Sequence, residues 1–204
     1  MKRSSDAKTI LSIFAAPFAL LLVPCDATAH LVTTGMGPVY DGIGHLLLTP
    51  EDLIPAIAIA LYAGLRGKDQ GRMVLFFFPL AWLTGGLAGI TISVDQTLQL
   101  PFISFLLLGA LIAADLSLPS SLITILVIVV GLTHGLYNGM AMVNGPGIPG
   151  LLGIMTTLFI LISITSAVVV SLRAAWALMA VRVSGSWIAA VGLLMLGWIF
   201  KGGG

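Results

Sequence analysis

Residues 148–172 read IPGLLGIMTTLFILISITSAVVVSL, a continuous run that carries no charged side chain. At 1.5 Å per residue, an α-helix of this length crosses the hydrocarbon core of a bilayer, which is about 30 Å thick. The rest of the chain is similar, because 58% of its residues are apolar and only 8% are charged. Too few polar side chains exist to cover a water-soluble surface, so the sequence predicts an integral membrane protein.

Five further apolar runs accompany this one, although the first and third are short for a complete crossing. We expect a helix over residues 41–48 to enter the membrane partly and to break at Thr49 and Pro50 before the first run continues. The predicted fold class is an all-α polytopic membrane protein, a six-transmembrane-helix bundle in one domain over residues 30–204. Its predicted spans are residues 52–65, 73–93, 101–115, 121–138, 148–172 and 183–200.

Residues 1–29 have the three parts of a secretory signal peptide: basic residues, an apolar run over 10–23, and Ala27-Thr28-Ala29 as the cleavage site. Cleavage would leave His30 first in the mature chain. Its free amine and imidazole can chelate a metal, but it also fits an ordinary flexible N-terminus. The only cysteine, Cys25, lies in the removed segment, so neither a disulfide nor a thiolate metal site is expected.

The charged residues predict an orientation. With the mature N-terminus outside, five of the six Lys and Arg residues beyond the signal fall on the cytoplasmic side, as the positive-inside rule requires. This places the protein in a bacterial inner membrane with its N-terminus in the periplasm. Four acids then lie outside, where they attract cations or are simply solvated: Asp41, Glu51, Asp52 and Asp95. The net charge of +1 provides no basic stripe for nucleic acid.

One polar stretch stands out, Asp41-Gly-Ile-Gly-His45-Leu-Leu-Leu-Thr49-Pro50-Glu51-Asp52. A near-continuous helix would put His45 and Asp52 on one face, seven residues apart, with Glu51 about 100° around. An imidazole with carboxylates suits a borderline divalent ion such as nickel, cobalt or zinc. The same residues are also a good helix start, with Thr49 as N-cap and acids in the first turn. Both readings can hold together.

A second polar stretch, His134-Gly-Leu-Tyr-Asn138-Gly-Met140-Ala-Met142, lies at the outer end of the fourth run. His134 and Asn138 are one turn apart and share a face, which must point into the bundle because an imidazole facing lipid is costly. His134 is expected either to bind a metal or to hydrogen-bond a neighbouring helix. Met140 and Met142 are sulfur ligands or ordinary apolar packing.

Small residues recur in the second and fourth runs, at Gly85, Gly86 and Gly89 and at Gly131, Gly135 and Gly139. Glycines at such spacing let two helices approach closely. They predict packing rather than chemistry.

These stretches resemble the signature regions of the HupE/UreJ family of small membrane proteins, which are associated with nickel or cobalt uptake. The first family pattern, His, five residues, then Asp-His, appears here as His45 followed by Glu51-Asp52. The second is similar to His134-Gly135 with Asn138-Gly139. The resemblance implies a metal site that includes His45, Glu51 and His134.

The chain departs from the family at three places. Asp52 and Asn138 stand where the family has histidine, and Ala141 replaces an acid. Asp52 and Asn138 are therefore oxygen donors in place of imidazoles, and with fewer imidazoles the family's metal preference does not carry over unchanged.

The sequence predicts a permease, not an enzyme, that takes a divalent metal from the outer side without a permanently bound cofactor. Its partners are the lipid bilayer and the metal ion, no nucleic acid, and it can form a homo-oligomer. No nucleotide-binding motif is present in the sequence, so movement would follow a gradient or the membrane potential. Two alternatives stay open: a membrane metalloenzyme with Glu51 as base, and a non-transporting scaffold. The predicted metal-site residues are His30, Asp41, His45, Glu51, Asp52, His134 and Asn138.

Overall fold

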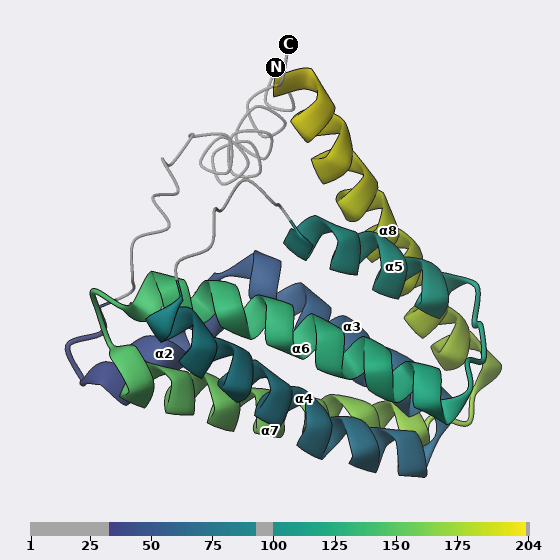
Figure 1. Cartoon of the computed structure of the whole chain (residues 1–204). Coiled ribbons are helices and arrows are strands. Elements are labelled where there is room, and N and C mark those ends of the chain that lie inside the picture. Colours follow the sequence, from purple (N-terminus) through teal and green to yellow (C-terminus); the bar gives the residue numbers. More distant parts are fainter. Residues whose placement is uncertain (1–32, 93–99, 203–204) are drawn as a thin grey trace, which may run out of the picture. The chain divides into compact units, whose positions relative to one another are not determined.

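The structure, a computed structural model, describes residues 33–92 and 100–202. These residues form seven α-helices and no β-strand (Figure 1), which confirms the predicted all-α class. The predicted signal peptide over 1–29, His30 and Asp95 lie outside the described residues. The helices are α2 (Pro38–Leu48), α3 (Pro50–Arg66), α4 (Lys68–Thr91), α5 (Leu100–Ala113), α6 (Ser120–Met142), α7 (Gly147–Ser171) and α8 (Ala175–Gly202).

Four of the described helices are individually long and apolar enough to cross a membrane: α4, α6, α7 and α8. The pair α2 and α3 adds a fifth crossing if the two helices form one broken span. Helix α5 has 14 residues, about 21 Å of helix, which is short of the hydrocarbon core. Each of the six predicted runs contains a helix, while length and composition support four or five spans among the described residues.

The predicted break between α2 and α3 is confirmed. Thr49 has extended backbone angles, φ −103° and ψ 96°, and the two helix axes differ in direction by 76°. The cause is Pro50, which has no N–H to continue the helix and disfavours a helical conformation in the residue before it. Thr49 occupies the N-cap position as predicted, but its side chain makes no capping hydrogen bond.

Helix α8 begins at Ala175 rather than at residue 183, so the predicted start of the last span was wrong. The predicted span began after Arg182 because a charged residue is unfavourable in the hydrocarbon core. In the structure Arg182 lies within the helix, and its Nε donates to the carbonyl oxygen of Ala113 at the end of α5, 3.3 Å away. A charged side chain is tolerated there because its long stem carries the guanidinium to a polar helix end.

The glycines of α4 and α6 pack these helices backbone against backbone, as predicted (Figure 1). A Cβ added to Gly135 would collide with the carbonyl oxygen of Trp82, and one added to Gly139 would collide with that of Gly86. The contact is reciprocal, because a Cβ on Gly85 would meet the Leu132 carbonyl. We call this contact between α4 and α6 the glycine seam.

The five basic residues predicted to lie inside gather at one end of the helices. Arg66 forms an ion pair with Asp115, and Arg182 reaches the neighbouring Ala113. The other three line one cavity between α4 and α7: Lys68, Arg72 and Arg173. The structure therefore agrees with the charge asymmetry on which the predicted orientation rests.

At the same end, the buried Tyr62 of α3 donates from its hydroxyl to the Leu116 carbonyl oxygen, 2.9 Å away. Tyr62→Phe removes this bond between α3 and the segment after α5. We expect the free energy of unfolding to fall by about 1 kcal/mol, measured by SDS titration in mixed micelles with tryptophan fluorescence. The control is Tyr40→Phe, the same change at a tyrosine that is 50% exposed. Equal stability of the two variants would contradict the role of the Tyr62 bond.

Candidate metal site

The site is built around Asp52, which the break at Thr49 places in the first turn of α3. Its side chain is enclosed, with only 6% of the residue exposed. The positive end of the α3 dipole favours a carboxylate at this position. A buried carboxylate also needs hydrogen-bond donors or a cation around it, because burial of an uncompensated charge is costly.

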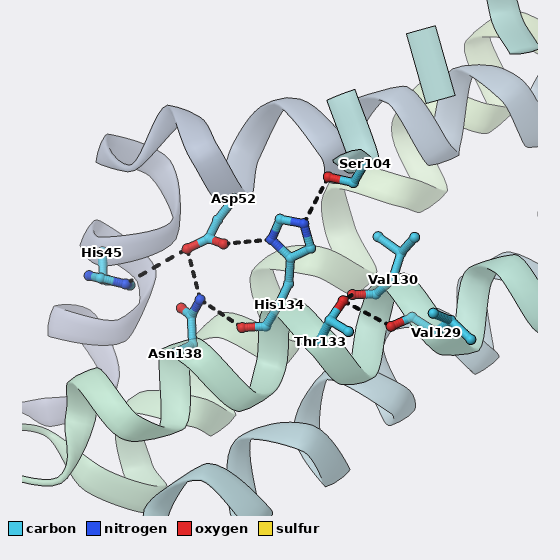
Figure 2. A network of polar contacts seen from close by, with 8 residues as sticks. All are labelled: His45, Asp52, Ser104, Val129, Val130, Thr133, His134 and Asn138. Carbon is cyan, nitrogen blue, oxygen red and sulfur yellow. Dashed lines mark hydrogen bonds and ion pairs between the residues drawn. The ribbon is translucent and has the colours of Figure 1, made fainter. Parts of the chain in front are cut away.

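Two residues of α6 supply donors to Asp52 (Figure 2). His134 Nδ1 lies 2.9 Å from Asp52 Oδ1, and Asn138 Nδ2 donates to Asp52 Oδ2 at 2.8 Å. A carboxylate only accepts, so with Asp52 ionised the Nδ1 atom of His134 carries the proton. Residues that are one turn apart on α6 thus hold both oxygens of one carboxylate.

His45 approaches the same carboxylate from α2, with 3.9 Å between its Nε2 and Asp52 Oδ2 (Figure 2). This separation is too long for a hydrogen bond. The two residues do not share the face of a near-continuous helix, as the spacing had suggested. They meet across the 76° bend, which turns the last part of α2 toward the first turn of α3.

His134 contacts side chains from three other helices. Its Nε2 lies 3.0 Å from Ser104 Oγ of α5, and its ring stacks on Trp82 of α4 with 5.2 Å between centroids. Only 1% of the residue is exposed. The prediction that His134 faces the bundle is confirmed, and the structure engages both of its ring nitrogens in polar contacts.

One side-chain atom of Asn138 is not used in these contacts. Its Nδ2 donates to Asp52 and to the His134 carbonyl oxygen, 3.1 Å away, which turns Oδ1 to the other side. This Oδ1 is buried and accepts no hydrogen bond from the described residues, and the residue is 3% exposed. A buried acceptor that lacks a donor is a place where a cation or a water molecule is stabilised.

The other predicted site residues stand apart from the contacts around Asp52. Glu51 is exposed, and Asp41 accepts from the backbone N–H and the hydroxyl of Thr34 through one oxygen, Oδ1. Met142 is fully buried against α7, where a Cβ on Gly150 would come 3.1 Å from its sulfur. His30 belongs to the part of the chain that is not described.

Within residues 33–92 and 100–202, no three His, Cys, Asp or Glu side chains form a ready group for holding a metal. Among these residues a mixed set surrounds the Asp52 carboxylate: the His45 imidazole, the His134 imidazole and the Asn138 amide, which faces Asp52 through Nδ2. Sequence reasoning missed Ser104 and Trp82. Ser104 gave a signal, as the only hydroxyl in the apolar run 101–115, whereas nothing distinguished Trp82 from a packing residue.

Comparison with known proteins gives one match. No curated protein and no solved structure matches this chain. The sequence model of the family described as HupE / UreJ protein matches residues 18–195, which is most of the chain and includes every element of the site. The chain therefore belongs to the HupE / UreJ family.

Proposed function

We propose that this protein is an inner-membrane permease that takes up a divalent transition-metal cation, nickel or cobalt, from the periplasmic side. Membership of the HupE / UreJ family supports a nickel- or cobalt-associated membrane protein. One observation carries the finer proposal. The buried carboxylate of Asp52 lies between His45 and the Asn138 amide, whose Oδ1 accepts no hydrogen bond from the described residues.

The proposed ligands are His45 Nε2, Asp52 Oδ2 and Asn138 Oδ1, with water completing the coordination. Binding would require the Asn138 amide to rotate, because its Nδ2 faces Asp52 Oδ2 in the structure. One imidazole and two oxygens suit a borderline ion such as Ni²⁺ or Co²⁺ better than a soft one. His134 would orient the Asp52 carboxylate through Nδ1, since its second nitrogen already faces Ser104. Three protein ligands hold an ion more loosely than a closed cage, and transport requires that the ion leave again.

Acids near the site would deliver the cation. Asp41 lies one turn before His45 on α2, and the exposed Glu51 directly precedes Asp52. The carboxylates of Asp41 and Glu51 would therefore add negative potential near the site. In the mature protein, the amine and imidazole of His30 would be an additional outer ligand. Inward movement would follow the membrane potential, which contributes about 2.3 kcal/mol per charge at 100 mV.

Uptake of Ni²⁺ into proteoliposomes tests the permease. We expect His45→Ala to lower the initial uptake rate by about tenfold, because it removes the imidazole ligand while leaving the His134 contacts in place. The matched control is Leu48→Ala on the same helix, at a residue that is 67% exposed. It is expected to transport at the parent rate.

Three results would contradict the proposal. Uptake that is equal in the parent and His45→Ala would exclude His45 from the site. Binding of Ni²⁺ by the purified protein without flux would favour a scaffold or accessory protein. Metal-dependent turnover of a substrate without flux would favour an enzyme.

A further inference from the structure

A cavity of about 380 Å³ opens between the first turns of α4 and the last turns of α7. It lies beyond the C-terminal end of α3, whereas Asp52 is in the first turn of that helix, about 20 Å away by the helical rise. The cavity is thus separate from the candidate metal site. Its polar lining includes three basic residues, Lys68, Arg72 and Arg173.

No ion pair with a described residue neutralises these three cations. Within residues 33–92 and 100–202, the ion pairs involve Arg66, His45 and His134, and no carboxylate lies within 4.0 Å of the three basic groups. Uncompensated positive charge around one hollow attracts anions and repels a divalent metal ion. The cavity therefore suits neither the proposed cargo nor its exit, but it suits a phosphate group.

The lining changes along the helices from basic to uncharged side chains, most of whose exposed surface is apolar. On α4, Lys68, Arg72 and Leu75 follow at intervals of four and three residues, which places them on one face. Arg173 lies just beyond the last residue of α7, and Ala167 and Val170 line the same cavity from within the helix. Ser163 and Ser166 line it there too, but their hydroxyls donate to carbonyl oxygens of α7 itself. Both helices are candidate membrane spans, so the basic part lies at a membrane surface and the apolar part points into the hydrocarbon.

We propose that this cavity binds an anionic phospholipid. The phosphate would lie among Lys68, Arg72 and Arg173, and the first carbons of an acyl chain would pack against Leu75, Ala167 and Val170. Basic pockets between transmembrane helices recognise acidic headgroups in this way. A free phosphate would use the three cations but would leave the apolar half without a partner, which is why we favour the lipid.

Native mass spectrometry of the delipidated full-length protein in detergent tests this proposal. The probes are a short-chain phosphatidylglycerol, the phosphatidylcholine with the same chains, and glycerol 3-phosphate as a headgroup without chains. We expect phosphatidylglycerol to bind most tightly. Arg72→Gln should weaken its binding about fivefold, the effect of one basic residue near an acidic lipid.

Two further variants separate the contributions. Ala167→Trp, at an exposed position in the apolar half, should weaken phosphatidylglycerol binding by occupying the chain site. Lys201→Gln should leave binding unchanged, because it removes an exposed charge at the C-terminal end of α8, which does not line the cavity. Arg173→Gln repeats the charge test if Arg72→Gln fails to fold.

The alternatives have distinct signatures. Equal binding of phosphatidylglycerol and phosphatidylcholine, unaffected by either arginine substitution, would overturn the proposal. Glycerol 3-phosphate that binds as tightly as the lipid, with no effect of Ala167→Trp, would also overturn it and indicate a free phosphate instead. These measurements do not involve the metal, so they are independent of whether the protein is a permease.

Discussion

Asp52→Asn is expected to lower the initial rate of Ni²⁺ uptake by at least about 100-fold, the largest functional effect of any single substitution in this chain. The substitution removes the negative charge on which His45 and Asn138 converge. It leaves the size of the side chain unchanged, so the loss reflects the charge and its ligand oxygen.

The fold should survive this change. The new amide places an NH₂ group opposite the NH₂ of Asn138. A rotation of the Asn138 amide would turn Oδ1, which accepts no hydrogen bond from the described residues, toward the new donor. Replacing a buried carboxylate by a neutral amide also removes the cost of desolvating a charge. The midpoint of thermal unfolding in detergent should therefore remain close to that of the parent.

The neighbouring residue provides the control. Glu51→Gln removes the same charge one position earlier, at an exposed side chain that makes no hydrogen bond to His134 or Asn138. It should reduce uptake by no more than about twofold, because it weakens only the attraction of cations to the surface. Uptake by Asp52→Asn within twofold of the parent would show that the carboxylate is not part of the transport site.

Gly135→Ala should cause the largest loss of stability, about 3 kcal/mol in the free energy of unfolding. Its Cβ would collide with the carbonyl oxygen of Trp82, a backbone atom that cannot rotate away. Helices α4 and α6 must therefore separate along the glycine seam. Because Trp82 stacks on His134, the displacement should also reduce Ni²⁺ uptake.

SDS titration in mixed micelles measures this effect, and Gly197→Ala is the control. A Cβ at Gly197 has no atom within 4 Å, so alanine there meets open space and should be neutral or slightly stabilising in a helix. If Gly135→Ala and Gly197→Ala unfold at the same SDS fraction, the close approach of α4 and α6 is not needed for stability.

Local signals in the sequence predicted much of this arrangement. Pro50 predicted the break because its missing N–H is a property of one residue, and the glycines of α4 and α6 predicted close packing because their spacing repeats along single helices. The start of α8 was predicted wrongly because Arg182 looked unfavourable inside a span. The acceptor for its side chain, the Ala113 carbonyl oxygen, lies on another helix.

At the candidate metal site, too, contacts between different helices could not be predicted from the sequence. The structure brings His45 and Asp52 close together, but the angle at which they meet depends on the size of the bend, which no spacing rule provides. Ser104 and Trp82 enclose His134 from α5 and α4, and their proximity depends on the packing of three helices. Sequence reasoning found residues whose chemistry is unusual in an apolar chain and missed those that only hold them in place.

Pro50 has one more effect, on the main chain. In an unbroken helix the carbonyl oxygen of Leu46 would receive the amide hydrogen four residues later, but proline has none to give. That oxygen is adjacent in sequence to His45, and its partial negative charge belongs to the peptide bond rather than to any titratable group. Acidification, which neutralises carboxylates and protonates imidazoles, leaves this contribution to the local electric field unaltered.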